Sequence, residues 1–306
     1  MVAEARSLSY NPRSAPVNTL GEYKSLGLGE FGLVLFLGSV VAGVVGSLAG
    51  LGGGLFVVPL LTIGFGVDIR YAIGASIVSV IATSSGAAAA YVRDQITNLR
   101  VGMFLELGTT TGAIVGATVA GLVNPSILFI IFGLVLAGSA LPLVTKLGEE
   151  LPQQVREDAW SRHLRLGSTY YDYVLRRPVS YAATRVWLGL AMMWVAGLFS
   201  GLLGIGSGAL KVLAMDTAMR LPMKVSTTTS NFMIGVTAAA SAGIYFGRGE
   251  VHPLLAAPVA LGVLLGALLG TRLLVRLRNK TLRLVFFPLL LIIALEMLLR
   301  GLGVST

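Results

Sequence analysis

Two short glycine-rich segments are the part of the sequence best suited to hold a ligand. They read Gly50-Leu-Gly-Gly-Gly54 and Gly204-Ile-Gly-Ser-Gly208, and both stand within long apolar runs. Successive glycines interrupt a helix, because each costs about 1 kcal/mol relative to alanine. A helix that restarts after the break presents unpaired N–H groups and roughly half a positive charge. This chemistry predicts an anion site, formed by Gly52, Gly53, Gly54, Gly206, Ser207 and Gly208.

Glycines in membrane helices have a second use, because small residues let two helices pack closely. Strict spacing of four favours that role for two further sets, Gly108, Gly112 and Gly116, and Gly262, Gly266 and Gly270. The same role remains an alternative for the two motif segments. A dinucleotide-binding loop is disfavoured, since neither segment follows a strand or fits G-x-G-x-x-G.

Lys211 is a charged residue in an otherwise apolar stretch. It lies one helical turn after Ser207 and Gly208, and side chains lean toward the N-terminus of their helix. Its ammonium is therefore expected to reach back to the second glycine break and to add positive charge there. A lysine that snorkels to the membrane interface is the alternative.

Hydroxyl and amide side chains supply further candidates. Ser76, Ser230 and Asn231 stand near the starts of apolar helices and are expected to donate to anion oxygens. Hydroxyls in membrane helices also bond to nearby carbonyls of the backbone, which is the alternative. Glu106 and Glu250 stand near the ends of apolar spans, where a solvated structural role is expected and a role as proton carriers is the alternative.

Composition places the chain in the membrane. Of its 306 residues 55% are hydrophobic and only 12% are charged, whereas a soluble domain has about 25% charged residues. The absence of Cys and the presence of only two His, His163 and His252, exclude thiolate chemistry and disfavour a metal site. No catalytic residue, metal or cofactor is expected. The net charge of +9 indicates basic loops that face anionic lipid rather than a nucleic-acid partner.

The uncharged runs predict an all-α polytopic integral membrane protein built from an internal duplication. Adding 154 to a residue number in the first half gives its counterpart in the second, as in Gly50/Gly204, Gly54/Gly208 and Ser76/Ser230. Four segments follow from the composition: a polar N-terminal segment 1–30, a first membrane repeat 31–146, a basic linker 147–181 and a second membrane repeat 182–300.

The positive-inside rule selects between two topologies. The run 31–67 is too long for one ordinary crossing of about 20 residues. If it and its counterpart each enter and return as a glycine-broken hairpin, each repeat adds about three transmembrane helices and the two repeats are inverted. The basic loops 147–181 and 272–283 then both face the cytoplasm, whereas four plain crossings per half place them on opposite sides.

The paired glycine segments with Pro59, together with the runs Met223-Lys-Val-Ser-Thr-Thr-Thr-Ser-Asn-Phe232 and Gly243-Ile-Tyr-Phe-Gly-Arg-Gly-Glu250, resemble the TauE/SafE family of sulfite exporters. This family is of the 4-toluene sulfonate uptake permease type, and the similarity spans about residues 31–300. The resemblance implies transport of small sulfur oxyanions or organosulfonates in a bacterial or archaeal plasma membrane. The second motif has Ser207 where the first has Gly53.

These features together predict a multi-pass transporter of the plasma (inner) membrane, not an enzyme. It is expected to export sulfite or an organosulfonate by alternating access, with the anion held at the two helix breaks near the membrane midplane. An anion channel and a proton- or sodium-coupled importer of thiosulfate or a related small anion are the alternatives. The expected partners are the anion and membrane lipid, and a homodimer is compatible with the apolar surface.

Overall fold

A computed structural model describes residues 28–49, 53–93, 96–145, 157–172, 176–274 and 279–304. Within these residues, the side chains at 28, 48–49, 86–93, 141–145, 172, 271–274 and 279–287 are not described. The N-terminal segment 1–27 and the first-repeat glycines 50–52 therefore lie outside the described residues.

The described chain is almost entirely helical, as the apolar runs predict. The α-helices are α1 (Leu28–Ala49), α2 (Gly54–Pro59), α3 (Ile69–Arg93), α4 (Leu99–Ala120), α5 (Pro125–Thr145), α6 (Ala159–His163), α7 (Val186–Leu203), α8 (Gly208–Leu213), α9 (Met223–Gly247), α10 (Pro253–Leu274) and α11 (Asn279–Gly301). Two short π-helical segments, η3 (Leu60–Gly64) and η4 (Ala214–Ala218), continue α2 and α8.

The two halves of the chain have matching elements. Adding 154 to the bounds of α2, η3, α3 and α4 gives the bounds of α8, η4, α9 and α10. The duplication predicted from the glycine positions therefore extends to the secondary structure, including the short π-helical segment in each half.

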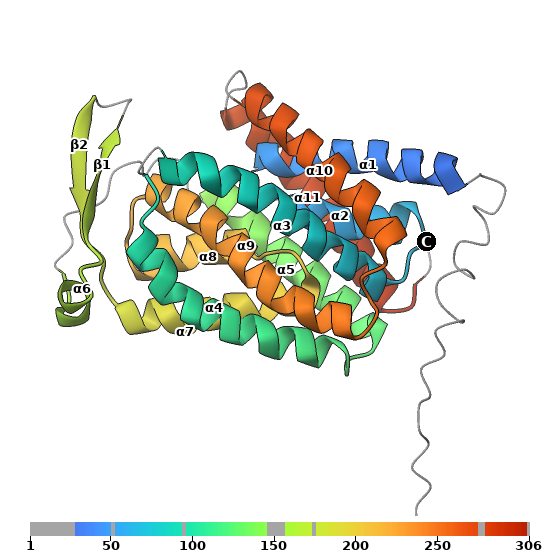
Figure 1. Ribbon diagram of the computed structural model, residues 1–306, viewed down its shortest axis with the longest axis horizontal. Coiled ribbons are helices and arrows are strands. Elements are labelled where there is room, and N and C mark those ends of the chain that lie inside the picture. The colour runs from blue at the N-terminus through green and yellow to red at the C-terminus, as the bar shows by residue number, and fades with distance from the viewer. Residues whose placement is uncertain are drawn as a thin grey trace, which may run out of the picture.

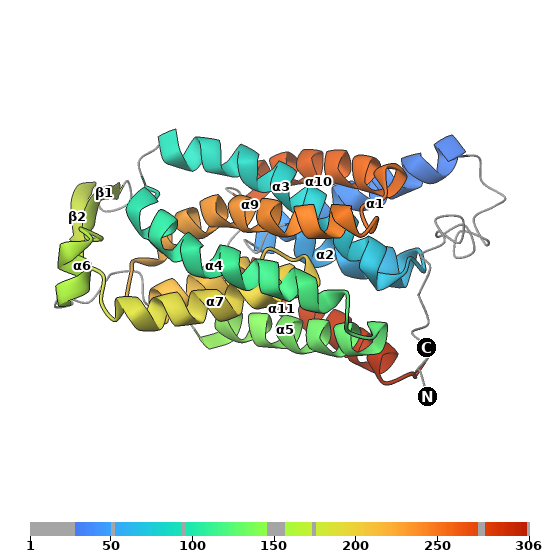
Figure 2. The same cartoon turned by 60° about the horizontal axis from the view of Figure 1, so that its bottom comes forward.

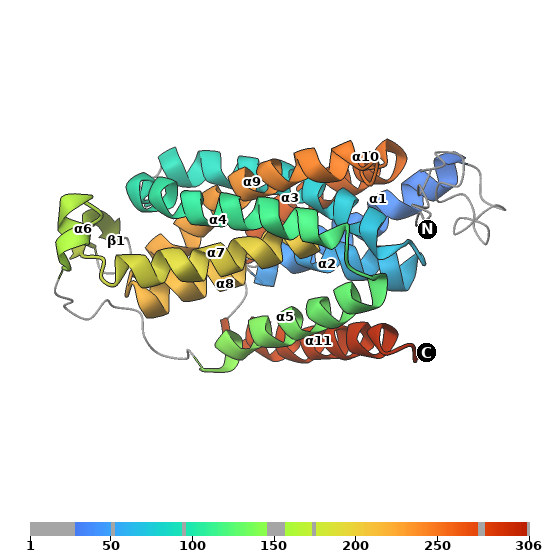
Figure 3. The ribbon, with the colours of Figure 1, turned by 90° about the horizontal axis from the view of Figure 1, so that it is seen from below.

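The long helices lie side by side along the longest axis of the molecule (Figure 1). Helix α1 packs on α10, α4 packs on α7, and α3 packs on its own counterpart α9. Figure 3 shows α5 and α11 together as a pair along one edge of the bundle. In Figure 2 the linker elements α6, β1 and β2 stand at one end, and the start of α1 and the end of α11 stand at the other.

Four helices of the described residues are long and apolar enough to cross a membrane. They contain the spans Gly29–Ser47, Leu99–Ala120, Val186–Leu203 and Pro253–Gly270. These helices are α1 and α4 with their second-half counterparts α7 and α10. The chain is therefore an all-α membrane protein, as its composition predicts.

Glycines form the seams between these four helices. A Cβ added at Gly112 or Gly116 of α4 would collide with backbone carbonyls of α7, and one added at Gly262 or Gly266 of α10 would collide with backbone of α1. The packing role predicted from their spacing of four is thus confirmed at these positions, because only glycine lets the two backbones approach so closely.

Helices α3 and α9 run in opposite directions although they are equivalent in sequence. Gly74, near the start of α3, lies against Glu250, which follows the end of α9. Further along, Ser84 of α3 lies against Gly235 of α9. Residue numbers rise on one helix as they fall on the other, which is the pattern of an antiparallel pair.

The linker between the halves has its own small structure. Strands β1 (Ser168–Asp172) and β2 (Arg177–Tyr181) pair antiparallel, with Ser168 opposite Tyr181. The apolar runs predict no strand in the linker, although the Thr, Tyr and Val residues of these two segments favour a β conformation. The hairpin is a minor addition to an all-α fold.

Asn98 fastens this linker to the membrane helices. Its side-chain oxygen caps α4 by accepting from the Val101 N–H at 3.1 Å. Its amide donates to the Leu166 carbonyl at 2.8 Å and to the Tyr181 hydroxyl at 2.9 Å. Burial raises the pKa of Tyr181, so its hydroxyl stays neutral in this contact.

Candidate functional site

The second glycine segment breaks the helix, as predicted. Helix α7 ends at Leu203, and Gly204 and Gly206 have φ values of +66° and +70°, a left-handed region that glycine adopts at low cost. Ser207 also has a positive φ, +41°, which is unusual for a residue with a side chain. The chain then restarts as α8 at Gly208. This backbone holds a sharp turn inside the bundle, where all residues from 201 to 208 are buried.

The first segment also separates two helices. Helix α1 ends at Ala49 and α2 begins at Gly54, while the predicted site residue Gly52 lies outside the described residues. Gly53 is described and has an ordinary helical conformation. Ser207 does not cap α8 with a side-chain hydrogen bond, and Gly53 has no side chain that could cap α2.

Ser76 brings the two breaks together. Its Oγ lies 3.0 Å from the carbonyl oxygen of Gly54 and 2.9 Å from that of Gly204, so one hydroxyl donor faces both. A Cβ added at Gly54 would lie 3.5 Å from the Gly204 oxygen. Segments that are far apart in sequence thus meet at one buried point.

The other predicted hydroxyls also contact backbone at the second break. Ser230 donates to the Gly208 carbonyl at 3.2 Å, and Ser207 donates to the Ala196 carbonyl of α7 at 2.6 Å. Asn231, the next residue on α9, is half-buried. In this structure the serine hydroxyls therefore hydrogen-bond to backbone carbonyls at or next to the breaks. This is the alternative to a contact with an anion.

Replacing Ser76 by alanine is expected to destabilise the meeting point of the breaks. Ser76→Ala leaves the buried carbonyls of Gly54 and Gly204 without their shared donor, at a cost of about 1–3 kcal/mol. The midpoint of thermal unfolding in detergent measures the effect. Ser79→Ala is the matched control, because the contact of that buried hydroxyl among the described residues is with the Ser76 carbonyl of its own helix. Equal loss of stability in both variants would contradict the bridging role.

Lys211 forms part of a buried chain of polar contacts. Its side chain is 0% exposed, and Nζ donates to Thr237 Oγ1 of α9 at 2.6 Å. That hydroxyl lies 2.6 Å from Glu106 Oε1 of α4 and 2.8 Å from the Met233 carbonyl, either of which accepts its proton. Thr110 donates to the same Glu106 oxygen at 3.0 Å. The ammonium thus contacts α9 directly and reaches α4 through the Thr237 hydroxyl.

The expectation of a solvated Glu106 is wrong. The residue is 8% exposed, and it lies about 10 Å along α4 from the start of the helix. Glu250 does lie beyond a helix end, where its Oε2 pairs with Arg248 at 2.7 Å. The Glu250 carboxylate therefore has a structural role beyond the end of α9, and the Glu106 carboxylate lies in the interior of the bundle, in the polar chain that includes Lys211.

The positions equivalent to the Lys211 chain by the offset of 154 carry no charge. The positions equivalent to Lys211, Thr237 and Glu106 are Val57, Thr83 and Ala260, so only the threonine is shared. Thr83 donates to the Ser79 carbonyl of its own helix, just as Thr237 contacts Met233. Lys211 of the second half and Glu106 of the first are therefore opposite charges whose own counterparts, Val57 and Ala260, are apolar.

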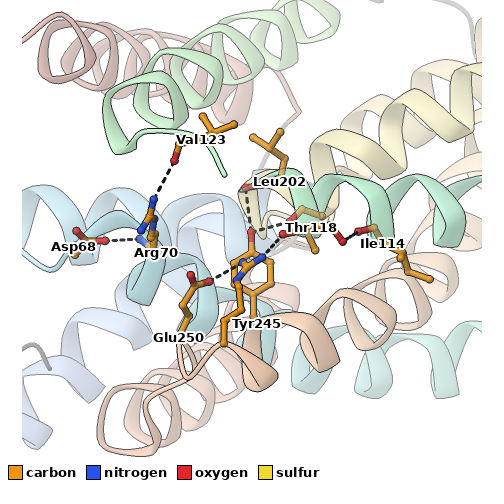
Figure 4. Close-up of polar contacts among 11 residues, drawn as sticks. Asp68, Arg70, Ile114, Thr118, Val123, Leu202, Tyr245 and Glu250 are labelled. Atoms are coloured by element: carbon orange, nitrogen blue, oxygen red, sulfur yellow. Dashed lines mark hydrogen bonds and ion pairs between the residues drawn. The ribbon is translucent and has the colours of Figure 1, made fainter. Parts of the chain in front are cut away.

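A second polar cluster holds the end of α7 just before its break (Figure 4). The Tyr245 hydroxyl donates to the carbonyls of Gly201 and Leu202 at 2.8 and 3.2 Å. The guanidinium of Arg248 lies 4.5 Å from the centre of the Tyr245 ring. Arg70, at the start of α3, donates to the Val123 carbonyl at 3.1 Å. The Tyr245 contacts thus hold the last turn of α7, directly before the second break.

Comparisons with known proteins agree on one family. The family model described as "Sulfite exporter TauE/SafE" matches residues 35–297. The chain is 28% identical over 279 residues to the probable membrane transporter protein YunE of Bacillus subtilis (strain 168), which covers 89% of this chain and 98% of that protein. It is 25% identical over 234 residues to the probable membrane transporter protein YdhB of the same organism, covering 76% and 84%. No solved structure matches the chain significantly.

Proposed function

Because the chain belongs to the TauE/SafE family of sulfite exporters, we propose that it exports a small sulfur-containing anion, sulfite or an organosulfonate, by alternating access. The anion is held where the two glycine breaks meet, by N–H groups at the starts of α2 and α8 and by the ammonium of Lys211. Gly53, Gly54, Gly206, Ser207 and Gly208 shape this site, and Ser76, Ser230 and Asn231 line it.

The convergence of the breaks on Ser76 is the observation that supports this proposal most. A single hydroxyl faces carbonyls from both halves of the chain, so the start of α2 lies close to Gly204, which ends α7 just before the turn that leads to α8. Lys211 follows one turn after Gly208 on α8. Backbone dipoles and an ammonium so placed favour an anion.

The repeats in this proposal are inverted, and the linker end of the bundle faces the cytoplasm. The antiparallel course of α3 and α9 supports the inversion, because equivalent helices of parallel repeats would run the same way. Helix α10 runs toward the end of the molecule that holds strand β2 (Figure 1). The linker 147–181 and the stretch 272–283 are rich in Lys and Arg. By the positive-inside rule, this end lies on the cytoplasmic side of the plasma membrane.

The direction of transport follows from the charge of the substrate. A membrane potential is worth about 2.3 kcal/mol per elementary charge for each 100 mV. A cell that is negative inside therefore drives sulfite outward without a coupled ion. Import of the same anion would need an ion to offset this force.

Sulfite efflux from proteoliposomes tests the proposal. We expect saturable efflux from vesicles containing the purified chain, and faster efflux when a potassium diffusion potential makes the interior negative. Protein-free vesicles are the control. Non-saturating flux carrying continuous current would instead identify an anion channel, and uptake of thiosulfate dependent on a proton or sodium gradient would identify an importer.

A further inference from the structure

Glu106 has a buried oxygen with no partner. Oε1 accepts from Thr237 and Thr110, but Oε2 has no hydrogen-bond partner among the described residues. An ionised carboxylate normally has all its buried lone pairs satisfied, because an unpaired buried charge is costly. The proposed export cycle assigns no role to the Glu106 carboxylate.

Lys211 is the charged residue that reaches Glu106 in the interior. Helix α7, which packs on α4, has no charged residue between 186 and 203. The other cations at the packed elements are Arg100 on the first turn of α4, Arg185 just before α7, Lys224 on the first turn of α9 and Arg248 after the end of α9. The ammonium and the carboxylate therefore balance one another across the hydroxyl of Thr237.

We propose that Glu106 is the resident counter-ion of Lys211, and that a substrate anion takes its place only when Glu106 binds a proton. This inference rests on the proposed function, since it concerns the same site. An ammonium has three N–H donors, and the Thr237 hydroxyl takes one of them. The remaining donors serve the incoming oxyanion, while Thr237 keeps its contact with the carboxyl group.

Replacement of the ionised Glu106 by the substrate anion, as the counter-ion of Lys211, keeps the net charge of the interior small. Without substrate, Lys211 and an ionised Glu106 sum to zero. If a monovalent anion arrived while Glu106 stayed ionised, the site would hold a net negative charge in a medium of low dielectric constant. Uptake of one proton onto Glu106 restores neutrality for a monovalent anion and leaves one net negative charge for a divalent anion such as thiosulfate, on which the membrane potential still acts. Proton binding and anion binding therefore promote each other, as linkage requires. The unpaired Oε2 is the oxygen that the proton occupies in this scheme.

Calorimetry of thiosulfate binding to the purified full-length chain tests the coupling. Thiosulfate stays fully ionised throughout the neutral range, whereas sulfite itself titrates there. Titrations in buffers of different ionisation enthalpy give the number of protons taken up with each anion. For the unsubstituted chain we expect close to one proton per thiosulfate where Glu106 is ionised, and a Kd that rises about tenfold for each pH unit in that range.

Glu106→Gln is expected to bind thiosulfate with no proton uptake and with a Kd that no longer depends on pH. It is also expected to gain a larger increase in Tm from thiosulfate than the unsubstituted chain, because the anion supplies the missing counter-charge. Glu296→Gln, which alters a carboxylate paired with Arg300 on α11, is the matched control and should retain the proton uptake. Equal proton uptake in Glu106→Gln and the unsubstituted chain would overturn the coupling.

A second measurement covers the case in which Glu106→Gln does not fold. Infrared difference spectra of the unsubstituted chain should gain the carbonyl band of a protonated carboxylic acid when thiosulfate is added. Thr110→Val keeps both charges and removes one hydrogen bond to Glu106, so it should shift that band. A spectrum without the band refutes proton uptake by Glu106 while leaving anion transport intact. If thiosulfate and sulfite bind to no form of the protein, the proposed function fails as well.

Discussion

Lys211→Met is expected to lower kcat/KM for sulfite efflux by about 100-fold. Truncating one partner of a buried charge pair costs about 2–5 kcal/mol, and each 1.4 kcal/mol corresponds to a factor of about ten in affinity or rate. Methionine is an unbranched side chain one atom shorter than lysine, and it removes the charge that the anion would contact. The measurement is the initial rate of efflux from proteoliposomes with equal amounts of folded protein.

Two further variants separate lost binding from lost stability. Lys211→Met leaves Glu106 as an unbalanced buried charge, so the double variant Lys211→Met/Glu106→Gln should recover the unfolding midpoint without recovering transport. Lys224→Met removes an exposed lysine from the start of α9 and should transport at the normal rate. Normal efflux by Lys211→Met would remove Lys211 from the anion site.

Gly112→Leu is expected to yield no stably folded protein. A Cβ at this position would collide with the Trp194 carbonyl and would lie 2.9 Å from the Leu198 nitrogen, so α4 and α7 must move apart. Overpacking of a well-packed interior costs about 1–3 kcal/mol, and a clash with rigid backbone belongs at or above the upper end. Yield of monodisperse protein on size exclusion and the unfolding midpoint measure the effect.

Gly243→Leu is the matched control for that substitution. It places the same side chain on helix α9 at an exposed position, where an added Cβ meets nothing within 4 Å. We expect this variant to be folded and slightly more stable, because leucine is a better helix former than glycine. If both variants fold equally well, close packing at the α4–α7 seam is not what holds the bundle together.

Much of the architecture could be predicted because local composition decides it. The uncharged runs mark the helices, and the glycine positions reveal the offset of 154 that relates the element bounds of the two halves. The second glycine break was predicted correctly, because Gly204 and Gly206 adopt backbone angles that other residues avoid. The β-hairpin escaped prediction, because its strands are short and lie in a polar linker without strict alternation.

The interior charge pair could not be predicted from local pattern, because it depends on the packing of three helices. Glu106 contacts Thr237 although the two are far apart in sequence. A weaker signal existed, since Glu106 and Lys211 are opposite charges in apolar spans, and such residues tend to pair. Position within the span was misleading: Glu106 stands near the start of α4, but α7 and α9 cover that part of the helix. Whether the predicted hydroxyls contact substrate remains a prediction, and in this structure those of Ser76, Ser207 and Ser230 face backbone carbonyls.

Lys211 of the second half and Glu106 of the first form a charged pair, whereas the equivalent pair, Val57 and Ala260, is uncharged, and this has an energetic consequence. Two identical halves would interconvert between inward-facing and outward-facing forms of equal free energy, each the image of the other. An ion pair present at only one of the two equivalent places removes that degeneracy. We expect the unloaded protein to rest with one orientation more populated than the other, and the bound anion to redistribute the two.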